Sequence, residues 1–228
     1  MGEWWSYGLS DLLLFSTATY YRLIARYNMA VWPAQFLTQT AGLVILAMLF
    51  RRPPWQGRAI TAILCAAWIW VAWAYHLQRY ATVNWVAPWF AAAFMAQAAI
   101  MLWSGVIRGR LAFKPSGAAS ITGLGLFIFA LVVQPLVAPL AGRTWLQTEL
   151  FAIMPDPTAV ATLGLLLMVR GSGSWMLMLI PMLWCLISGA VLWGMHAPEA
   201  IMTPLAAFIV LVFAAGNSGN RKSIPQDP

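Results

Sequence analysis

Carboxylates are rare in this sequence, so the positions at which they stand are the first candidates for chemistry. The chain has 228 residues but only 6 of them are Asp or Glu. One of these, Asp156, stands between Pro155 and Pro157 in the stretch IMPDPTAVATLG. Aspartate followed by proline is typical of a helix start, because the carboxylate accepts free backbone N–H groups and proline fits the first helical position. The pattern predicts that the chain is interrupted at or just before Pro155 and that a new helix starts at Asp156 or Pro157.

The depth of Asp156 favours a role beyond capping. The apolar run that follows it, 157–169, gives about 20 Å of helix, which is too short to cross a bilayer alone. If the far end of this run lies at the membrane surface, Asp156 lies below the opposite surface, where a charge without a partner is costly. We expect Arg143 or Arg79 to be that partner, with His76 as the next choice. The alternative is a simple cap on a short helix in a locally thinned bilayer.

Other polar residues fall on the same predicted side of the membrane as Asp156. Two of them, His76 and Arg79, are about one helical turn apart and share a face. Groups of this kind hold ions and substrates or relay protons in transporters. The alternative is that acids are only kept away from the anionic cytoplasmic leaflet. The candidate substrate or proton site comprises Asp156, Glu149, Arg143, His76, Arg79 and Glu199.

Residue types exclude several reactive sites. A retinal Schiff base needs a lysine inside a span, whereas the only lysines, Lys114 and Lys222, lie in predicted cytoplasmic flanks. Cys65 and Cys185 lie far apart in apolar runs, which argues against a disulfide framework or a zinc site. The sequence has no glycine-rich phosphate loop and no HExxH motif. We therefore expect no cofactor and no metal, and an intramembrane enzyme is the least favoured class.

Composition predicts that this protein lies in a lipid bilayer. Hydrophobic residues make up 62% of the chain and charged residues 8%, and the mean hydropathy is +0.76. Because soluble domains carry about 25% charged residues, any compact fold of this chain would expose apolar groups. The net charge of +7 does not indicate nucleic-acid binding, since the basic residues cluster at the ends of apolar runs. We interpret the chain as an integral membrane protein whose main partner is the bilayer.

The apolar segments predict an all-α, polytopic helix bundle over residues 29–215. A membrane-crossing helix needs about 20 mostly apolar residues. Turn-rich or basic stretches such as RRPPWQGR and RGSGS set the segment boundaries. About seven transmembrane segments result, of which the fifth is short or broken: 29–50, 59–77, 83–107, 118–140, about 157–169, 175–195 and 199–215.

The basic residues predict the orientation of this bundle. Nine of them fall on one side of the predicted segments and four on the other, which places the first side in the cytoplasm. The N-terminus is then outside and the C-terminus inside. The cytoplasmic set is Arg51, Arg52, Arg58, Arg108, Arg110, Lys114, Arg170, Arg221 and Lys222, and the outer set is Arg22, Arg26, Arg79 and Arg143.

Two flanking regions complete the predicted organisation. Residues 1–28 carry apolar and aromatic side chains at helical spacing, with Arg22 and Arg26 one turn apart, which predicts an amphipathic helix lying in the outer membrane interface. A lid packed over the bundle is the alternative. We expect residues 216–228 to form a polar cytoplasmic tail.

Six stretches carry a resemblance to a known family: EWW, SDLLLFS, TYYRL, VWPAQ, HLQRYATVNW and PDPTAVATLGLLL. Together they resemble an uncharacterised family of bacterial integral membrane proteins, a domain of unknown function, over nearly the whole chain. The resemblance implies a location in the bacterial inner membrane. Some members carry the label of transporter permease, but the resemblance supplies no established activity and no residue roles.

These observations favour a small permease or channel-like protein with an outer-facing polar vestibule around Asp156, which would pass a small solute or ion. The competing hypothesis is a non-catalytic accessory or sensor subunit of a membrane complex, in which the same polar groups only pack or bind a partner. A watery cavity that reaches Asp156 would favour transport, whereas a dry and fully paired carboxylate would favour packing.

Overall fold

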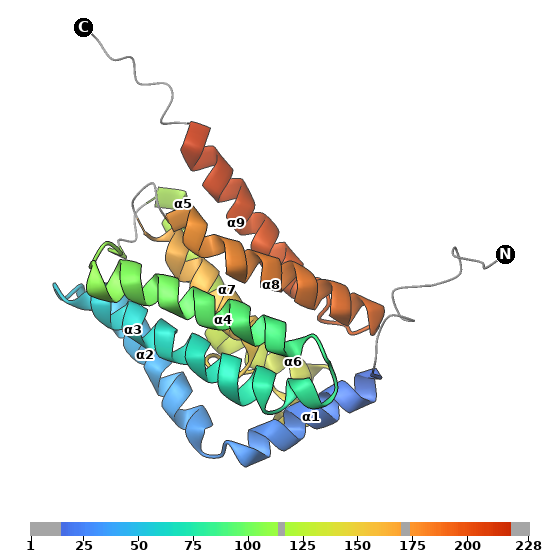
Figure 1. Ribbon diagram of the computed structural model, residues 1–228. Coiled ribbons are helices and arrows are strands. Elements are labelled where there is room, and N and C mark those ends of the chain that lie inside the picture. Colours follow the sequence, from blue (N-terminus) through green and yellow to red (C-terminus); the bar gives the residue numbers. More distant parts are fainter. Residues whose placement is uncertain (1–14, 114–116, 170–173, 220–228) are drawn as a thin grey trace, which may run out of the picture.

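Helices form most of the computed structural model, which describes residues 15–113, 117–169 and 174–219 (Figure 1). Within these ranges there is no strand, only a single bridge between Phe113 and Val169. Several helices continue into turns of π-helix, at Val71–Leu77, Leu102–Ile107 and Phe129–Val133. The α-helices are α1 Thr17–Ala30, α2 Ala34–Arg51, α3 Gln56–Trp70, α4 Ala87–Met101, α5 Gly117–Ile128, α6 Gln134–Leu140, α7 Pro155–Leu167, α8 Ser174–Gly194 and α9 Met202–Gly219.

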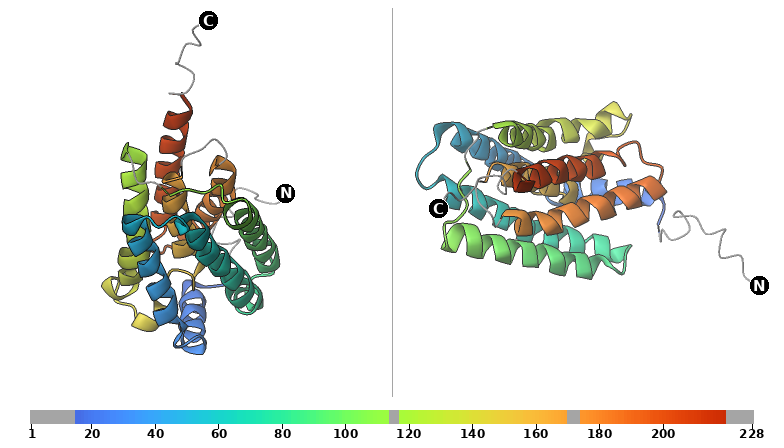
Figure 2. Two further views of the ribbon diagram at one scale, coloured as in Figure 1. Left: turned by 90° about the vertical axis from the view of Figure 1, so that its left-hand side faces the viewer. Right: turned by 90° about the horizontal axis from the view of Figure 1, so that it is seen from above.

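Five of the described helices are long and apolar enough to cross a membrane. They run roughly side by side along one direction (Figure 2), and a shorter apolar helix, Met202–Ala214, joins them. Large apolar side chains such as Leu37, Ile121 and Phe208 are exposed on the outside of the bundle. A surface of this kind suggests a membrane protein. The five candidate spans are Ala34–Arg51, Gln56–Thr82, Ala87–Ile107, Gly117–Leu140 and Trp175–Gly194.

The described part of the chain therefore has fewer candidate spans than the about seven expected. The predicted fifth segment corresponds to α7, which has 13 residues, and all 13 side chains are buried inside the protein. Helices α5, α8 and α9 pack around it, and α3 reaches it through a hydrogen bond from Trp68 Nε1 to Thr162 Oγ1 at 2.9 Å. The sequence of α7 is apolar because the helix forms the core of the bundle. Hydropathy alone does not distinguish such a helix from one that faces lipid.

Two glycines allow α5 and α7 to approach with their backbones in contact. A Cβ atom built on Gly123 would lie 2.3 Å from the carbonyl oxygen of Gly164, and one built on Gly164 would lie 2.5 Å from the carbonyl oxygen of Gly123. No side chain fits between the helices at this point. Small residues serve this purpose in many membrane-protein interfaces.

The short helix α7 connects the two ends of the bundle. Its 13 residues rise about 20 Å, against about 30 Å for the hydrocarbon core of a bilayer. Val169, just beyond its C-terminus, bridges to Phe113, whereas its N-terminus lies among the polar residues of the opposite end. The chain that leads into α7 is irregular backbone with a single 3₁₀ turn, Trp145–Gln147, and it covers the length that α7 does not.

The first helix, α1, lies across one end of the bundle (Figure 1). It begins after Ser16, whose hydroxyl accepts a hydrogen bond from the backbone N–H of Thr19 at 3.3 Å. One face of α1 is buried, including Tyr20, Ile24 and Tyr27, and the helix contacts the Trp145–Gln147 turn. Residues 1–14 of the predicted interfacial segment lie outside the described ranges, as do residues 220–228 of the predicted tail.

Candidate functional site

The carboxyl group of Asp156 points sideways from α7 to α8. Trp184 Nε1 donates a hydrogen bond to Oδ1 at 2.7 Å, and the hydroxyl of Ser188 donates to Oδ2 at 2.6 Å. The helix starts at Pro155, after Met154 in extended conformation, so Asp156 is the second helical residue and caps nothing. The predicted interruption before α7 is present, but the predicted capping role is wrong.

The predicted ion pair of Asp156 is also wrong. Among the described residues, the ion pair at this end of the molecule joins Arg143 to Glu199, with 2.8 Å between Nη2 and Oε1. The guanidinium of Arg143 also stacks over the ring of Tyr21 at 4.1 Å, and the Tyr21 hydroxyl donates to Glu199 Oε1 at 3.0 Å. Glu199 forms the ion pair with Arg143 because its side chain extends from the turn before α9, whereas the side chain of Asp156 is turned toward α8.

Glu149 lies in the irregular connection before α7, where the chain is held firmly. The hydroxyl of Thr158 accepts from the backbone N–H of Ala152 at 2.9 Å and donates to the carbonyl of Met154 at 2.7 Å. Ala152 has a positive φ of 60°, a conformation that costs an alanine energy and that its surroundings must impose. These contacts fix the connection against the first turn of α7.

Glu149 is a carboxyl group in protein surroundings that favour its neutral form. It accepts a hydrogen bond from the Tyr20 hydroxyl at 3.3 Å and one from Gln134 Nε2 at 3.5 Å. Burial raises the pKa of Glu149 well above its ordinary value, and the carboxylates of Asp156 and Glu199 raise it further. Arg143 and the Tyr20 hydrogen bond lower this pKa, but by less. Glu149 is thus the acid of this site that is best suited to hold a proton.

These groups surround one small cavity. It measures about 10 Å³, enough for about one water molecule. All three acidic residues within the described ranges line it, together with Arg143, and each comes from a different part of the chain. The cavity is therefore a small polar chamber, and Arg143, Gln147 and Glu149 at its edge are half-buried.

Several buried polar atoms around this chamber have no hydrogen-bond partner among the described residues. Buried polar groups are nearly always hydrogen-bonded, to protein or to water. An unusual concentration of such atoms therefore marks a place suited to a small hydrogen-bonding species. The atoms are Gln134 Oε1, Arg143 Nε, Arg143 Nη1, Glu199 Oε2 and Thr203 Oγ1.

His76 lies outside the chamber, in an aromatic cluster beside it. Its ring is fully buried, and neither ring nitrogen has a hydrogen-bond partner within the part of the chain that the structure describes. The ring packs at steep angles against Phe94 at 4.6 Å and Trp184 at 5.0 Å between centroids. Since Trp184 also binds Asp156, one indole separates His76 from the carboxyl group.

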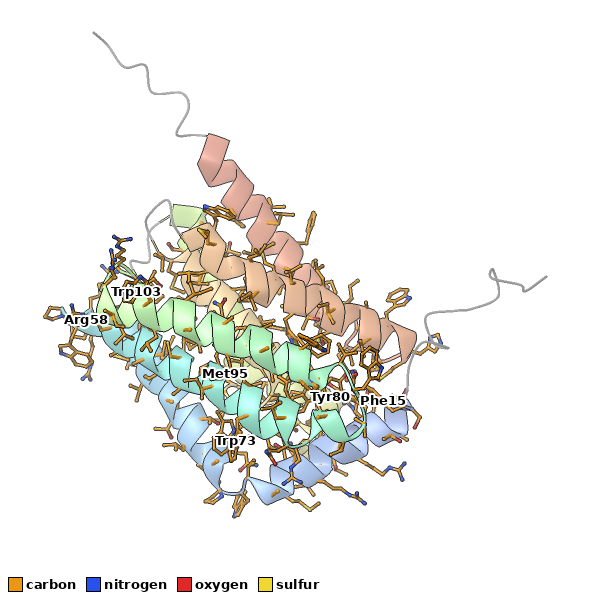
Figure 3. The ribbon with its side chains drawn as sticks, viewed as in Figure 1. Phe15, Arg58, Trp73, Tyr80, Met95 and Trp103 are labelled. Carbon is orange, nitrogen blue, oxygen red and sulfur yellow. The ribbon has the colours of Figure 1, made fainter. Side chains whose placement is uncertain are left out.

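A second small cavity, also of about 10 Å³, lies within this aromatic cluster and is lined by Tyr20, Tyr80 and Ser188 among others. Tyr20 lines this second cavity, and its hydroxyl donates a hydrogen bond to Glu149 of the polar chamber. Figure 3 labels Tyr80 together with Phe15 at this end of the bundle, and Arg58 with Trp103 at the other.

Arg79 is the predicted site residue that the structure leaves apart. Its side chain is exposed and does not line the chamber. Of the six predicted residues, the structure therefore brings Asp156, Glu149, Arg143 and Glu199 together, places His76 behind Trp184 and leaves Arg79 outside.

Sequence reasoning missed several residues of the site, namely Tyr20, Tyr21, Trp184, Ser188 and Thr203. Trp184 and Ser188 are spaced by four residues inside an apolar helix, which places an N–H and a hydroxyl on one face. That spacing was a usable signal for a polar partner. No comparable pattern marks Tyr21 or Thr203, which the tertiary fold brings to the chamber.

With this geometry established, comparison with known proteins gives one match. The model of a family of unknown function, DUF6064, matches residues 17–222. The chain belongs to this family. The match to DUF6064 runs from the start of α1 to beyond α9, so it includes every residue of the polar chamber, and it confirms the resemblance to an uncharacterised family. No curated protein and no solved structure matches the chain.

Proposed function

We propose that this protein is a small proton-conducting or proton-coupled permease of the bacterial inner membrane. The observation that carries the proposal is the small polar chamber, which gathers three carboxyl groups and one arginine at one end of a bundle of apolar helices. Ionisable groups inside membrane bundles are costly, and they mark proton and ion pathways in pumps and transporters.

The proposed orientation places the chamber at the outer side of the membrane. It is supported by the distribution of acids within the described ranges: they lie around the chamber, whereas Arg52, Arg58 and Arg108 at the other end have no acid beside them. Positive residues favour the cytoplasmic side. Because α7 rises only about 20 Å, the chamber at its N-terminus then lies below the outer surface of the membrane.

In this proposal Glu149 carries the proton. Its raised pKa favours the neutral form, and the Tyr20 hydroxyl beside it extends toward the second cavity. The ion pair of Arg143 and Glu199 closes the chamber toward the outside, since both residues come from outer connections. In the structure the chamber has room for a proton and about one water, so a larger solute requires the ion pair to open.

The test is proton flux through the purified protein in liposomes that enclose a pH-sensitive dye. With an imposed pH gradient, the native protein is expected to dissipate the gradient faster than protein-free liposomes, and Glu149→Gln is expected to be slowed at least about tenfold. Arg79→Gln is the matched control, because Arg79 lies at the same end but outside the chamber. Native flux equal to the protein-free leak, or full flux through Glu149→Gln, would refute the proposal.

One observation favours the second candidate, an accessory or sensor subunit. Both oxygens of Asp156 have hydrogen-bond donors on α8, as expected for a carboxyl group that only joins two helices. A native protein that passes neither protons nor solutes, and whose Asp156→Asn variant is simply less stable, would favour this candidate.

A further inference from the structure

The end of the bundle opposite the polar chamber has an open pocket with three arginines. It has a volume of about 830 Å³, within the range of small-molecule sites. One wall is the connection between α2 and α3 with the first turn of α3, and the other is the segment 108–113. Arg52, Arg58 and Arg108 line the pocket.

The walls of this pocket are held in place by specific contacts. Gln56 is buried, and its Nε2 donates to the carbonyl of Phe113 at 3.2 Å. At Gly57 the backbone meets the opposite wall so closely that a Cβ atom would lie 2.0 Å from the carbonyl oxygen of Leu111. Phe113 is itself bridged to Val169 beyond α7. The pocket is therefore a fixed feature of the fold.

The three arginines are exposed, and no acid of the described ranges lies beside them. Every acid within the described ranges lies around the polar chamber at the other end. Arg108 stacks on Trp103 at 4.8 Å, which orients its guanidinium. Arg52 ends α2 with a positive φ of 52°, a position that usually favours glycine or asparagine. An arginine in this strained position suggests that its side chain is required there.

We propose that this pocket binds a phosphate group, carried either by an anionic phospholipid or by a small soluble phosphate compound. The planar guanidinium donates two parallel hydrogen bonds to phosphate oxygens, which makes arginine the preferred residue for such recognition. The first turn of α3 lies in the same pocket and adds the positive end of its helix dipole. The exposed Trp55 on the rim is suited to the membrane interface.

Native mass spectrometry of the purified protein tests the lipid source. The protein in detergent micelles is mixed with phosphatidylglycerol or with phosphatidylcholine, and the retained lipid is counted. We expect the native protein to retain phosphatidylglycerol preferentially and the double variant Arg58→Gln/Arg108→Gln to bind it about tenfold more weakly. Arg22→Gln/Arg26→Gln is the matched control, since it removes the same charge from exposed positions on α1 and is expected to change nothing.

Thermal unfolding with added glycerol phosphate tests the soluble source, because a ligand that binds only the folded state raises the melting temperature. A rise in the native protein that is absent from Arg58→Gln/Arg108→Gln assigns the pocket to soluble phosphates. The variant Arg58→Lys/Arg108→Lys keeps the charge but loses the paired donors, so it is expected to bind more weakly than native in whichever assay responds. Equal binding by native and glutamine variants in both assays would overturn the proposal, as would an equal loss in the α1 control.

Discussion

At the residue scale, the role of each acid follows from the groups that face it. The residue Asp156 was predictable as the polar centre of this region, but its partners were not. Arg143 and Arg79 were expected because opposite charges attract, whereas the structure uses the indole of Trp184 and the hydroxyl of Ser188. Neutral donors on one helix are enough to satisfy both oxygens of this buried carboxyl group, whereas sequence alone ranks charged partners first.

The hydrogen bonds of Asp156 can be measured through Ser188. Ser188→Ala is expected to lower the free energy of unfolding by about 1.5–3 kcal/mol, because it leaves Oδ2 of a buried carboxyl group without a donor. In an Asp156→Asn background the same change is expected to cost less, because Ser188 then makes a hydrogen bond between two neutral groups, which is weaker than one to a carboxylate. Unfolding of the native protein and the three variants in detergent gives the coupling between the two residues. Equal costs in both backgrounds would contradict the contact.

The pH dependence of stability can be assigned to Glu149. Burial raises the pKa of Glu149 in the folded protein, so the folded state keeps this proton while the unfolded chain releases it at a pKa of about 4.3. The unfolded state then binds fewer protons above that pH, and the free energy of unfolding falls as pH rises toward the folded pKa, by up to about 1.4 kcal/mol per pH unit.

The variant Glu149→Gln has no such proton and is expected to lack this fall. The native protein and the variant are to be unfolded in detergent at several pH values from acidic to neutral, and their difference isolates Glu149. The free energy of unfolding of the variant should increase relative to that of the native protein as pH rises. If the stability of the variant instead falls relative to that of the native protein as pH rises, the ionised form of Glu149 stabilises the fold.

At the scale of elements, the helices were predictable and the role of one of them was not. The predicted runs 118–140 and 175–195 match the observed spans Gly117–Leu140 and Trp175–Gly194 closely, because long apolar runs between turn-rich stretches leave little choice. The run 157–169 was recognised as too short to cross, and it forms α7. That α7 is enclosed on all sides depends on contacts with helices far away in sequence, which no local pattern encodes.

The close approach of α5 and α7 gives a prediction with a control in the same helix. Gly123→Ala is expected to destabilise the protein by several kcal/mol or to displace α7, because its Cβ meets the backbone of Gly164. Gly125→Ala, two residues away, meets nothing within 4 Å and is expected to be neutral or slightly stabilising through helix propensity. Melting temperatures in detergent check both. Equal effects of the two substitutions would argue against the backbone contact.

At the scale of the whole molecule, the separation of charge predicts opposite exposure of the two ends. Pro54 and Thr144 are both exposed, one beside the arginine pocket and the other beside the polar chamber. In cells, Pro54→Cys is expected to react with a thiol reagent only after the membrane is made permeable, and Thr144→Cys without that treatment. The native Cys65 and Cys185 are buried and serve as the unlabelled background. Reversed labelling would invert the orientation and remove the outer position of the chamber.

The enclosure of α7 has a consequence for how the protein is made. Its partners lie on both sides of it in the chain, α5 before and α8 and α9 after. Thr203 of the chamber lies on α9, and Glu199 lies in the turn just before it. When α7 leaves the ribosome, the helices that will cover Asp156 have not yet been synthesised. A segment of 13 residues with a carboxyl group is a poor substrate for insertion by itself. The last helix must therefore be synthesised before the polar chamber is complete, and a nascent chain that stops short of α9 would leave the α9-facing side of α7 uncovered.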